Sequence, residues 1–320
     1  MNSLTVNSPA KLNLFLYVDK KRKDRFHNII TLFERIDLAD RLTLASLKED
    51  KIEIVSDSPD IPLNQDNIVF QAARIFKDAF DIKRGVRITI KKRIPVSRGL
   101  GGGSSNAAAT LLGLARLWRV KISRDRLMRL GRALGADVGF FLSRTSFALG
   151  EGRGDRITAI TDIKNKFWHV LLVPEIRVPT RFVYERFDHR RSIRGFLSRK
   201  GRLLPQKGLS RPGPRDKKLE KQALTIARVN VKMLHNALKA NDFSSIGKNL
   251  WNGLEGVSFR YFKKVRLIKK VLEKHGLSAT LMSGSGSSVF SLLGSRKEAQ
   301  EIKRRLDGLS RCEIIIARTY

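Results

Sequence analysis

The sequence predicts an α+β protein of two domains. It has 320 residues, of which 42% are apolar, so the chain has room for two domains with sizeable cores. Stretches of alternating apolar residues, typical of strands, are interspersed with stretches that have apolar residues at helical spacing. A glycine-rich loop at 99–103 leads from one such strand into a helix. We expect a first domain at residues 1–162 and a second at residues 163–320.

The composition bears on the compartment in which the protein works. The single cysteine, Cys312, cannot form a disulfide within the chain, which indicates a reducing environment. The sequence has no apolar run of membrane-spanning length. Lys11 interrupts the apolar start where a signal peptide would need an unbroken core. We therefore expect a cytoplasmic protein without a membrane partner.

The net charge of +34 attracts nucleic acids and anionic surfaces in general. Residues 190–221 carry 12 basic and 2 acidic residues, a net +10, and contain three prolines, so we expect a loop or linker with little regular structure there. The remaining +24 is distributed over the rest of the chain, which argues against a dedicated basic arm. We expect no dedicated nucleic-acid partner, although non-specific contact of residues 190–221 with RNA stays open.

The first elements follow from their apolar patterns. Residues 8–16 are predicted as a strand with leucines on one face, and Lys11 and Asn13 lie with Phe15 on the other, a pattern also typical of a solvated outer face. Residues 67–80 are predicted as an amphipathic helix, with Asp66 or Asn67 as its N-cap. Capping alone would explain an asparagine at that position.

The glycine-rich loop has the composition of a polyphosphate site. Residues 86–90 alternate as a strand, and residues 104–118 are predicted as a helix. Four glycines between them allow an anion to approach the backbone N–H groups, and the helix start adds unpaired N–H groups and a positive dipole. Ser104 and Ser105 are expected to cap the first turn or donate to a phosphate. The loop is neither a Walker A motif nor a dinucleotide fingerprint, and a flexible linker or tight turn is the alternative.

The remaining elements alternate between helix and strand. Ser123 is predicted to cap a helix that Gly135 ends, and Asp137 follows in an apolar setting where a carboxylate needs a partner or caps the next helix. Strands and turns are predicted at 146–160 and a strand at 167–173. Further on we expect a helix around 265–272, a glycine-serine turn between strands at 280–290, a helix capped by Ser295 and a strand at 313–317.

The loop sequence Pro-x-x-x-Gly-Leu-Gly-Gly-Gly-Ser-Ser-Asn-Ala-Ala resembles the phosphate-binding loop of the GHMP kinases. This resemblance implies a ribosomal-protein-S5-like N-terminal domain and a ferredoxin-like C-terminal domain with the active site between them. It also implies ATP and Mg²⁺ as cofactors, with metal ligands that stay open. The residues implied in nucleotide binding are Pro95, Val96, Ser97, Arg98, Gly99, Leu100, Gly101, Gly102, Gly103, Ser104, Ser105 and, near the adenine, Asn67.

The opening Pro-Ala-Lys-Leu-Asn-Leu resembles one branch of these kinases, which phosphorylates the 2-hydroxyl of 4-diphosphocytidyl-2-C-methyl-D-erythritol in the non-mevalonate isoprenoid pathway. The resemblance implies that Lys11 is catalytic and that Asn13 faces the substrate. It assigns the cytosine to Phe26 and His27, and to Tyr184 as a second aromatic. This chain differs from the branch at two neighbouring positions. Arg25 stands in place of a glycine, and Phe26 replaces a tyrosine.

The stretch Gly-Ala-Asp-Val-Gly-Phe-Phe resembles a further motif of the same branch, with Gly139 in place of proline. It implies that Asp137 acts on the substrate hydroxyl, so Asp137 is the expected general base. A nearby Lys11 ammonium would favour the ionised carboxylate and stabilise charge on the transferred phosphoryl group.

Two alternatives stay open. One is a GHMP kinase for another alcohol, such as mevalonate or homoserine. The other is a basic RNA-binding protein on the S5-like fold. A monomer and a homodimer are both compatible with the sequence.

Overall fold

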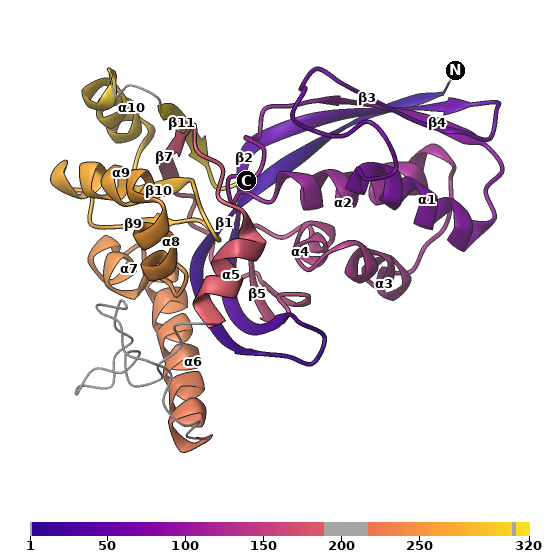
Figure 1. Ribbon diagram of the computed structural model, residues 1–320. Helices are drawn as coiled ribbons and strands as arrows, with labels where there is room; N and C mark the ends of the chain where they lie inside the picture. Colours follow the sequence, from indigo (N-terminus) through magenta and orange to yellow (C-terminus); the bar gives the residue numbers. More distant parts are fainter. Residues whose placement is uncertain (1, 189–216, 309–311) are drawn as a thin grey trace.

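The computed structural model describes residues 2–188, 217–308 and 312–320. These residues form two sheets, each accompanied by helices (Figure 1). The first sheet has the strand order β3-β4-β2-β1-β8, and β5 and β6 extend it beside β2. Its strands are β1 (Ser3–Lys21), β2 (His27–Leu47), β3 (Ile52–Ser56), β4 (Gly85–Lys91), β5 (Phe147–Gly152), β6 (Arg156–Ile160) and β8 (Trp251–Asn252).

Four helices accompany the first sheet, namely α1 (Ile68–Phe80), α2 (Gly102–Leu117), α3 (Arg124–Leu134) and α4 (Val138–Ser143). The helix α2 packs directly on β1 and β2, and its small residues allow this close approach. A β-carbon at Gly113 would lie only 3.0 Å from the side chain of Leu44 on β2. The alanines at 107–109 are likewise buried, so the alanine-rich sequence suits a helix that lies against a sheet.

The second sheet is antiparallel, with the order β11-β7-β10-β9. Its strands are β7 (Trp168–Pro174), β9 (Thr280–Met282), β10 (Val289–Leu293) and β11 (Cys312–Arg318). The helices of this half are α5 (Thr180–Asp188), α6 (Lys217–Ala240), α7 (Phe243–Asn249), α8 (Glu255–Tyr261), α9 (Lys263–Lys274) and α10 (Arg296–Leu306). Figure 1 shows α5 between the helices of the first half and those of the second.

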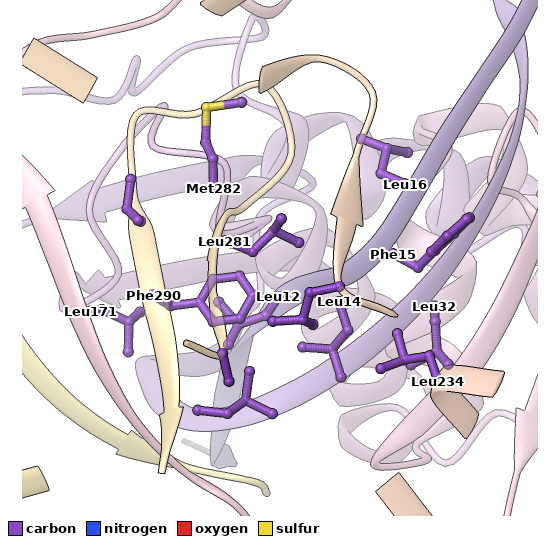
Figure 2. Packing of buried hydrophobic residues seen from close by; sticks show 14 of the residues in the cluster. Leu12, Leu14, Phe15, Leu16, Leu32, Leu171, Leu234, Leu281, Met282 and Phe290 are labelled. Atoms are coloured by element: carbon purple, nitrogen blue, oxygen red, sulfur yellow. The ribbon is translucent and has the colours of Figure 1, made fainter. Parts of the chain in front are cut away.

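A continuous apolar core joins the two halves. Leucines of β1 meet β9 and β10 of the second sheet, as Figure 2 shows for Leu12, Leu14, Leu281 and Phe290, each at most 2% exposed. Burying one such side chain contributes about 1.5–3 kcal/mol, so this core strongly stabilises the arrangement of the two halves. In addition, the short strand β8 from the second half of the sequence pairs with β1. The expected division between residues 162 and 163 stays a prediction.

Most predicted elements are confirmed, with three corrections. The strand expected at 8–16 is longer, and β1 is buried on both faces from Ser8 to Val18, so Lys11 and Asn13 do not lie on a solvated face. Residues 217–221 were expected to lack regular structure but begin α6, while residues 190–216 lie outside the described residues. The helices α5, α6, α7 and α8 and the strands β2, β3 and β8 were not predicted. None of the helices in the described ranges is long and apolar enough to cross a membrane.

The turn between β1 and β2 contains a strained residue. Arg25 has φ of 67°, in the left-handed region, and the turn is closed by a 2.6 Å hydrogen bond from the Arg22 N–H to the Phe26 carbonyl. A side chain in this conformation costs about 1–2 kcal/mol, which glycine avoids. This positive φ is a physical reason for the glycine that the branch described above has in place of Arg25.

We predict that Arg25→Gly raises the free energy of unfolding. The relief of strain exceeds the extra backbone entropy that glycine loses, about 0.5–1 kcal/mol, so the net gain should be about 0.5–1 kcal/mol. The midpoint temperature of thermal unfolding, followed by fluorescence, should rise by about 1–2 °C. Arg25→Ala is the matched control, because it removes the charged side chain and keeps the β-carbon. An equal rise in both variants would show that the charge, and not the backbone, causes the effect.

Candidate active site

A cleft of about 1300 Å³ lies where the two halves meet. Residues of β1, the glycine-rich loop, the start of α4, the helix α5 and the β9–β10 turn line it. Among its lining residues are all the predicted site residues except Ser105. The fold therefore brings together side chains that are far apart in the sequence.

The floor of one end of the cleft is the start of α2. The helix begins at Gly102, two residues before the predicted start, and its N-cap is Gly101 with φ of 70°. No side chain of the described residues caps it, so of the two roles expected for Ser104 and Ser105, capping and donation to a phosphate, capping is excluded. Because the first N–H groups of a helix have no partner within the helix, this end presents donors and a positive dipole to the cleft. A polyphosphate fits these donors.

Two of the loop glycines are required by neighbouring atoms. A β-carbon at Gly99 would lie 2.2 Å from the Ser283 carbonyl oxygen, and one at Gly101 would lie 2.9 Å from the Lys11 side chain. The loop is also hydrogen-bonded on two sides. The Lys11 N–H donates to the Leu100 carbonyl at 3.0 Å, and the Ser283 hydroxyl donates to the Gly99 carbonyl at 2.9 Å. The β9–β10 turn therefore folds back onto the loop.

Ser105 does not face the cleft. Its hydroxyl donates to the Pro9 carbonyl at 2.6 Å and accepts from Ser8 at 2.7 Å, and the side chain is 1% exposed. Its N–H donates to the Gly101 carbonyl. The geometry argues against our expectation that Ser105 binds nucleotide, because its polar groups already have partners within the protein. Ser104, its neighbour, does line the cleft.

The centre of the cleft holds Lys11 and Asp137. The Lys11 ammonium lies 3.4 Å from the Asp137 carboxylate and donates to the Asn13 amide oxygen at 2.5 Å. The Asn13 amide in turn donates to the Thr31 hydroxyl at 2.8 Å, which fixes its orientation. The Lys11 side chain is 6% exposed and that of Asp137 29%, so the carboxylate is the accessible member of the pair.

Asp137 occupies the N-cap position of α4, yet its side chain makes no capping bond. The capping explanation for this aspartate is therefore not supported, and the carboxylate is available to a ligand. At the other end of α4, the buried Arg35 guanidinium donates to the carbonyls of Phe140 and Phe141 at 3.3 and 3.1 Å. Burial lowers the pKa of Arg35 to about 10, which leaves it charged at neutral pH. Sequence reasoning missed Arg35, although a charged residue inside an apolar strand is a usable clue.

The far end of the cleft is aromatic. The His27 ring lies 5.0 Å from the Tyr184 ring, and its Nε2 is 2.6 Å from the Asp188 carboxylate. Lys21 also pairs with Asp188, at 3.0 Å. Burial opposes ionisation of Asp188, but the hydrogen bonds from His27 and Lys21 outweigh it and lower its pKa. Sequence reasoning missed Asp188, because it lies 161 residues from His27 and no local pattern marks it.

The other two aromatic residues differ in exposure. Phe26 is 51% exposed at the rim of the cleft. Tyr184 is partly buried, and its burial, followed by the nearby Asp137 charge, raises the pKa of its phenol. The hydroxyl therefore stays protonated at neutral pH and is able to donate a hydrogen bond.

Asn67 is the N-cap of α1. Its amide oxygen accepts from the Val69 N–H at 2.9 Å and its amide nitrogen donates to the Pro62 carbonyl at 2.6 Å. The capping role is confirmed. Asn67 also lines the cleft, and its contact with the nucleotide stays a prediction.

Within the described residues, no three histidine, cysteine or acidic side chains gather in a way that could hold a metal ion. Mg²⁺ typically keeps several waters and binds through one or two carboxylates together with substrate phosphates. The cleft fits that mode, because the partly exposed Asp137 carboxylate shares it with the unpaired N–H groups at the start of α2, to which phosphates could bind.

Comparison with known proteins agrees with this geometry. Residues 67–144 match the GHMP kinases N terminal domain and residues 234–309 match the GHMP kinases C terminal domain. A 4-diphosphocytidyl-2-C-methyl-D-erythritol kinase of Bacillus cereus (strain AH187) is 37% identical over 314 residues, covering 98% of this chain and 96% of the relative.

Solved structures give the same result. A crystal structure of 4-(cytidine 5'-diphospho)-2C-methyl-D-erythritol kinase matches with a TM-score of 0.72 and 30% identity, covering 98% of this chain and 99% of the other. A homoserine kinase from Cytophaga hutchinsonii shares the fold, with a TM-score of 0.69 at 19% identity over 100% of this chain and 95% of the other. The predicted two-domain GHMP kinase fold is thereby confirmed, and the chain belongs to the 4-diphosphocytidyl-2-C-methyl-D-erythritol kinases within the GHMP kinase superfamily.

Proposed function

We propose that the protein transfers the γ-phosphoryl group of ATP to the 2-hydroxyl of 4-diphosphocytidyl-2-C-methyl-D-erythritol, in the non-mevalonate isoprenoid pathway. The observation that carries this proposal is the position of the Lys11–Asp137 pair, which lies in one cleft with the start of α2 and the His27–Tyr184 end. Family membership supports the choice of substrate over mevalonate or homoserine.

The chemistry assigned to Asp137 is that of a general base. Its carboxylate accepts the proton of the 2-hydroxyl while the oxygen attacks the γ-phosphorus in line and ADP leaves. The Lys11 ammonium, 3.4 Å away, stabilises the negative charge that develops on the attacking oxygen and the phosphoryl group. Phosphoryl transfer depends on alignment and charge neutralisation more than on a strong base, so the fixed pair and the helix start suit it.

The loop residues 95–104 and the start of α2 would hold the ATP phosphates through backbone N–H groups. When bound, Mg²⁺ would neutralise phosphate charge, and Asp66 and Asp137 are among the acidic side chains that line the cleft and could contact it directly or through water. Asn13 would position the sugar hydroxyl, and its orientation is already fixed by Thr31. Phe26, His27 and Tyr184 would bind the cytosine ring by stacking and hydrogen bonding.

The charge of the chain favours a second reading, that of a basic RNA-binding protein on the same fold. That reading leaves the partly enclosed Lys11–Asp137 pair without a role, so we place it second. We further propose a cytoplasmic protein, either a monomer or a homodimer, with domains at residues 1–162 and 163–320.

We predict that Asp137→Asn lowers kcat about a hundredfold or more while both KM values stay within about threefold, because the amide keeps the shape of the site but cannot accept the proton. A coupled assay of ADP release with Mg-ATP checks this. It is run in parallel with the cytidyl substrate, mevalonate and homoserine.

Turnover of mevalonate or homoserine instead of the cytidyl compound would contradict the proposed substrate. Failure with all three alcohols, together with salt-sensitive RNA binding, would support the second reading. Full activity of the Asp137→Asn variant would remove Asp137 from the mechanism and leave the substrate assignment intact.

The two neighbouring serines give a further prediction. Ser105→Ala leaves the Pro9 carbonyl without its buried partner, so it should lower the free energy of unfolding by about 1–2 kcal/mol and change KM for ATP less than about twofold. Ser104→Ala is the matched control, and should raise KM for ATP about threefold or more with unchanged stability. Urea unfolding and steady-state kinetics of both variants distinguish the two roles. The reverse pattern would restore Ser105 as a nucleotide ligand.

A further inference from the structure

Arg153 lines the cleft but has no part in the reaction proposed above. It lies in the tight turn between β5 and β6. The flanking residues Gly152 and Gly154 have φ of 69° and 96°, values that glycine adopts without strain. The Arg153 N–H donates to the Asp155 carboxylate at 3.1 Å, so the backbone of this turn is well defined.

The guanidinium of Arg153 is fixed by three contacts. It donates to the Asp155 carboxylate at 3.1 Å and to the Arg132 carbonyl at 3.3 Å. Its third contact is with an aromatic ring, because the guanidinium carbon lies 5.0 Å from the centroid of Phe26. A cation within about 6 Å of a ring centroid is attracted to the ring, more strongly when it is partly removed from water. The Arg153 side chain is 25% exposed, so this condition is met.

Phe26 needs such a contact. It lies in the β1–β2 turn and is 51% exposed, and a phenyl ring has no polar group with which to fix its orientation. The charges of the two turns also lie close together. The hydrogen bond from Arg22 lowers the pKa of Asp24, and the positive charge of Arg153 adds to that shift. Arg153 therefore connects the β5–β6 turn to the β1–β2 turn that carries Phe26.

We propose that Arg153 is a positioning residue for the base-binding end of the cleft. It holds the Phe26 ring as one wall of a slot for a flat pyrimidine base, with His27 and Tyr184 as the other side chains of that slot. This inference rests on the proposed function, because it takes the base to be that of a cytidine diphosphate compound. The role is a specificity role, since ATP binds at the other end of the cleft.

Steady-state kinetics of two variants test the proposal. Arg153→Leu should raise KM for the cytidyl substrate about five- to tenfold, while kcat and KM for ATP stay within about twofold. Arg153→Lys keeps a cation near the ring and should raise that KM less than about threefold. A rise in both KM values with a fall in the unfolding temperature would indicate a general structural role and overturn the proposal.

A double-mutant cycle tests whether Arg153 acts through Phe26. If it does, the variant that combines Arg153→Leu with Phe26→Leu should have the same KM for the cytidyl substrate as Phe26→Leu alone. If the two effects multiply, Arg153 acts independently of the ring, and the positioning role is wrong.

Calorimetric titration with cytidine diphosphate separates this inference from the proposed function. If the wild-type protein binds cytidine diphosphate but does not phosphorylate the cytidyl alcohol, the proposed reaction is wrong. The affinity of the slot for the base can still be measured in that case. A weaker Kd in Arg153→Leu, about fivefold or more, then supports the positioning role, and an unchanged Kd overturns it. Absence of cytidine diphosphate binding by the wild-type protein overturns the slot itself.

Discussion

The arrangement of the cleft depends on the burial of one ammonium group, that of Lys11, whose side chain is 6% exposed. Removing a charge from water costs several kcal/mol unless an opposite charge and hydrogen-bond acceptors replace the lost hydration. Asp137 and Asn13 supply these replacements at 3.4 and 2.5 Å. Since Asp137 is the N-cap of α4, the requirement places the start of α4 beside Lys11, with the carboxylate lining the cleft. The same pairing that makes burial tolerable creates the proposed base and its electrostatic partner.

The strand β1 serves both the core and the chemistry. Its leucines pack against the second sheet (Figure 2), while Lys11 and Asn13 belong to the opposite side. The pairing of β1 with β2 shifts register between Pro9 and Ala10 and again between Asn13 and Phe15. Such irregularities twist a strand and redirect side chains, and they are common beside active sites. They flank the two functional residues, so the local bend of β1 and the position of the site are linked.

Local sequence patterns predicted those features, such as helix caps, that interactions within a few residues determine. Ser123 and Ser295 were recognised as caps, and Asn67 as one of two candidates with Asp66, because a short polar side chain before an apolar period has that role in most contexts. The same reasoning failed at α2, where tertiary contacts prevail: the Ser105 hydroxyl reaches the Pro9 carbonyl and glycine caps the helix instead. The partners Asp188 and Arg35 were not predictable, because their roles exist only once distant segments meet.

The charge of the chain bears on function mainly through its distribution. Seven basic and three acidic residues line the cleft, a modest surplus that suits two phosphate-bearing ligands and accounts for little of the net +34. Much of the remainder is on solvent-facing helices such as α9, which has six basic residues and one acidic residue. Exposed charges are screened beyond about 8 Å at physiological ionic strength, so they have little effect on chemistry in the cleft. The partly enclosed Lys11–Asp137 pair is screened far less, and its geometry, not the overall charge, therefore determines the electrostatics at the reacting atoms.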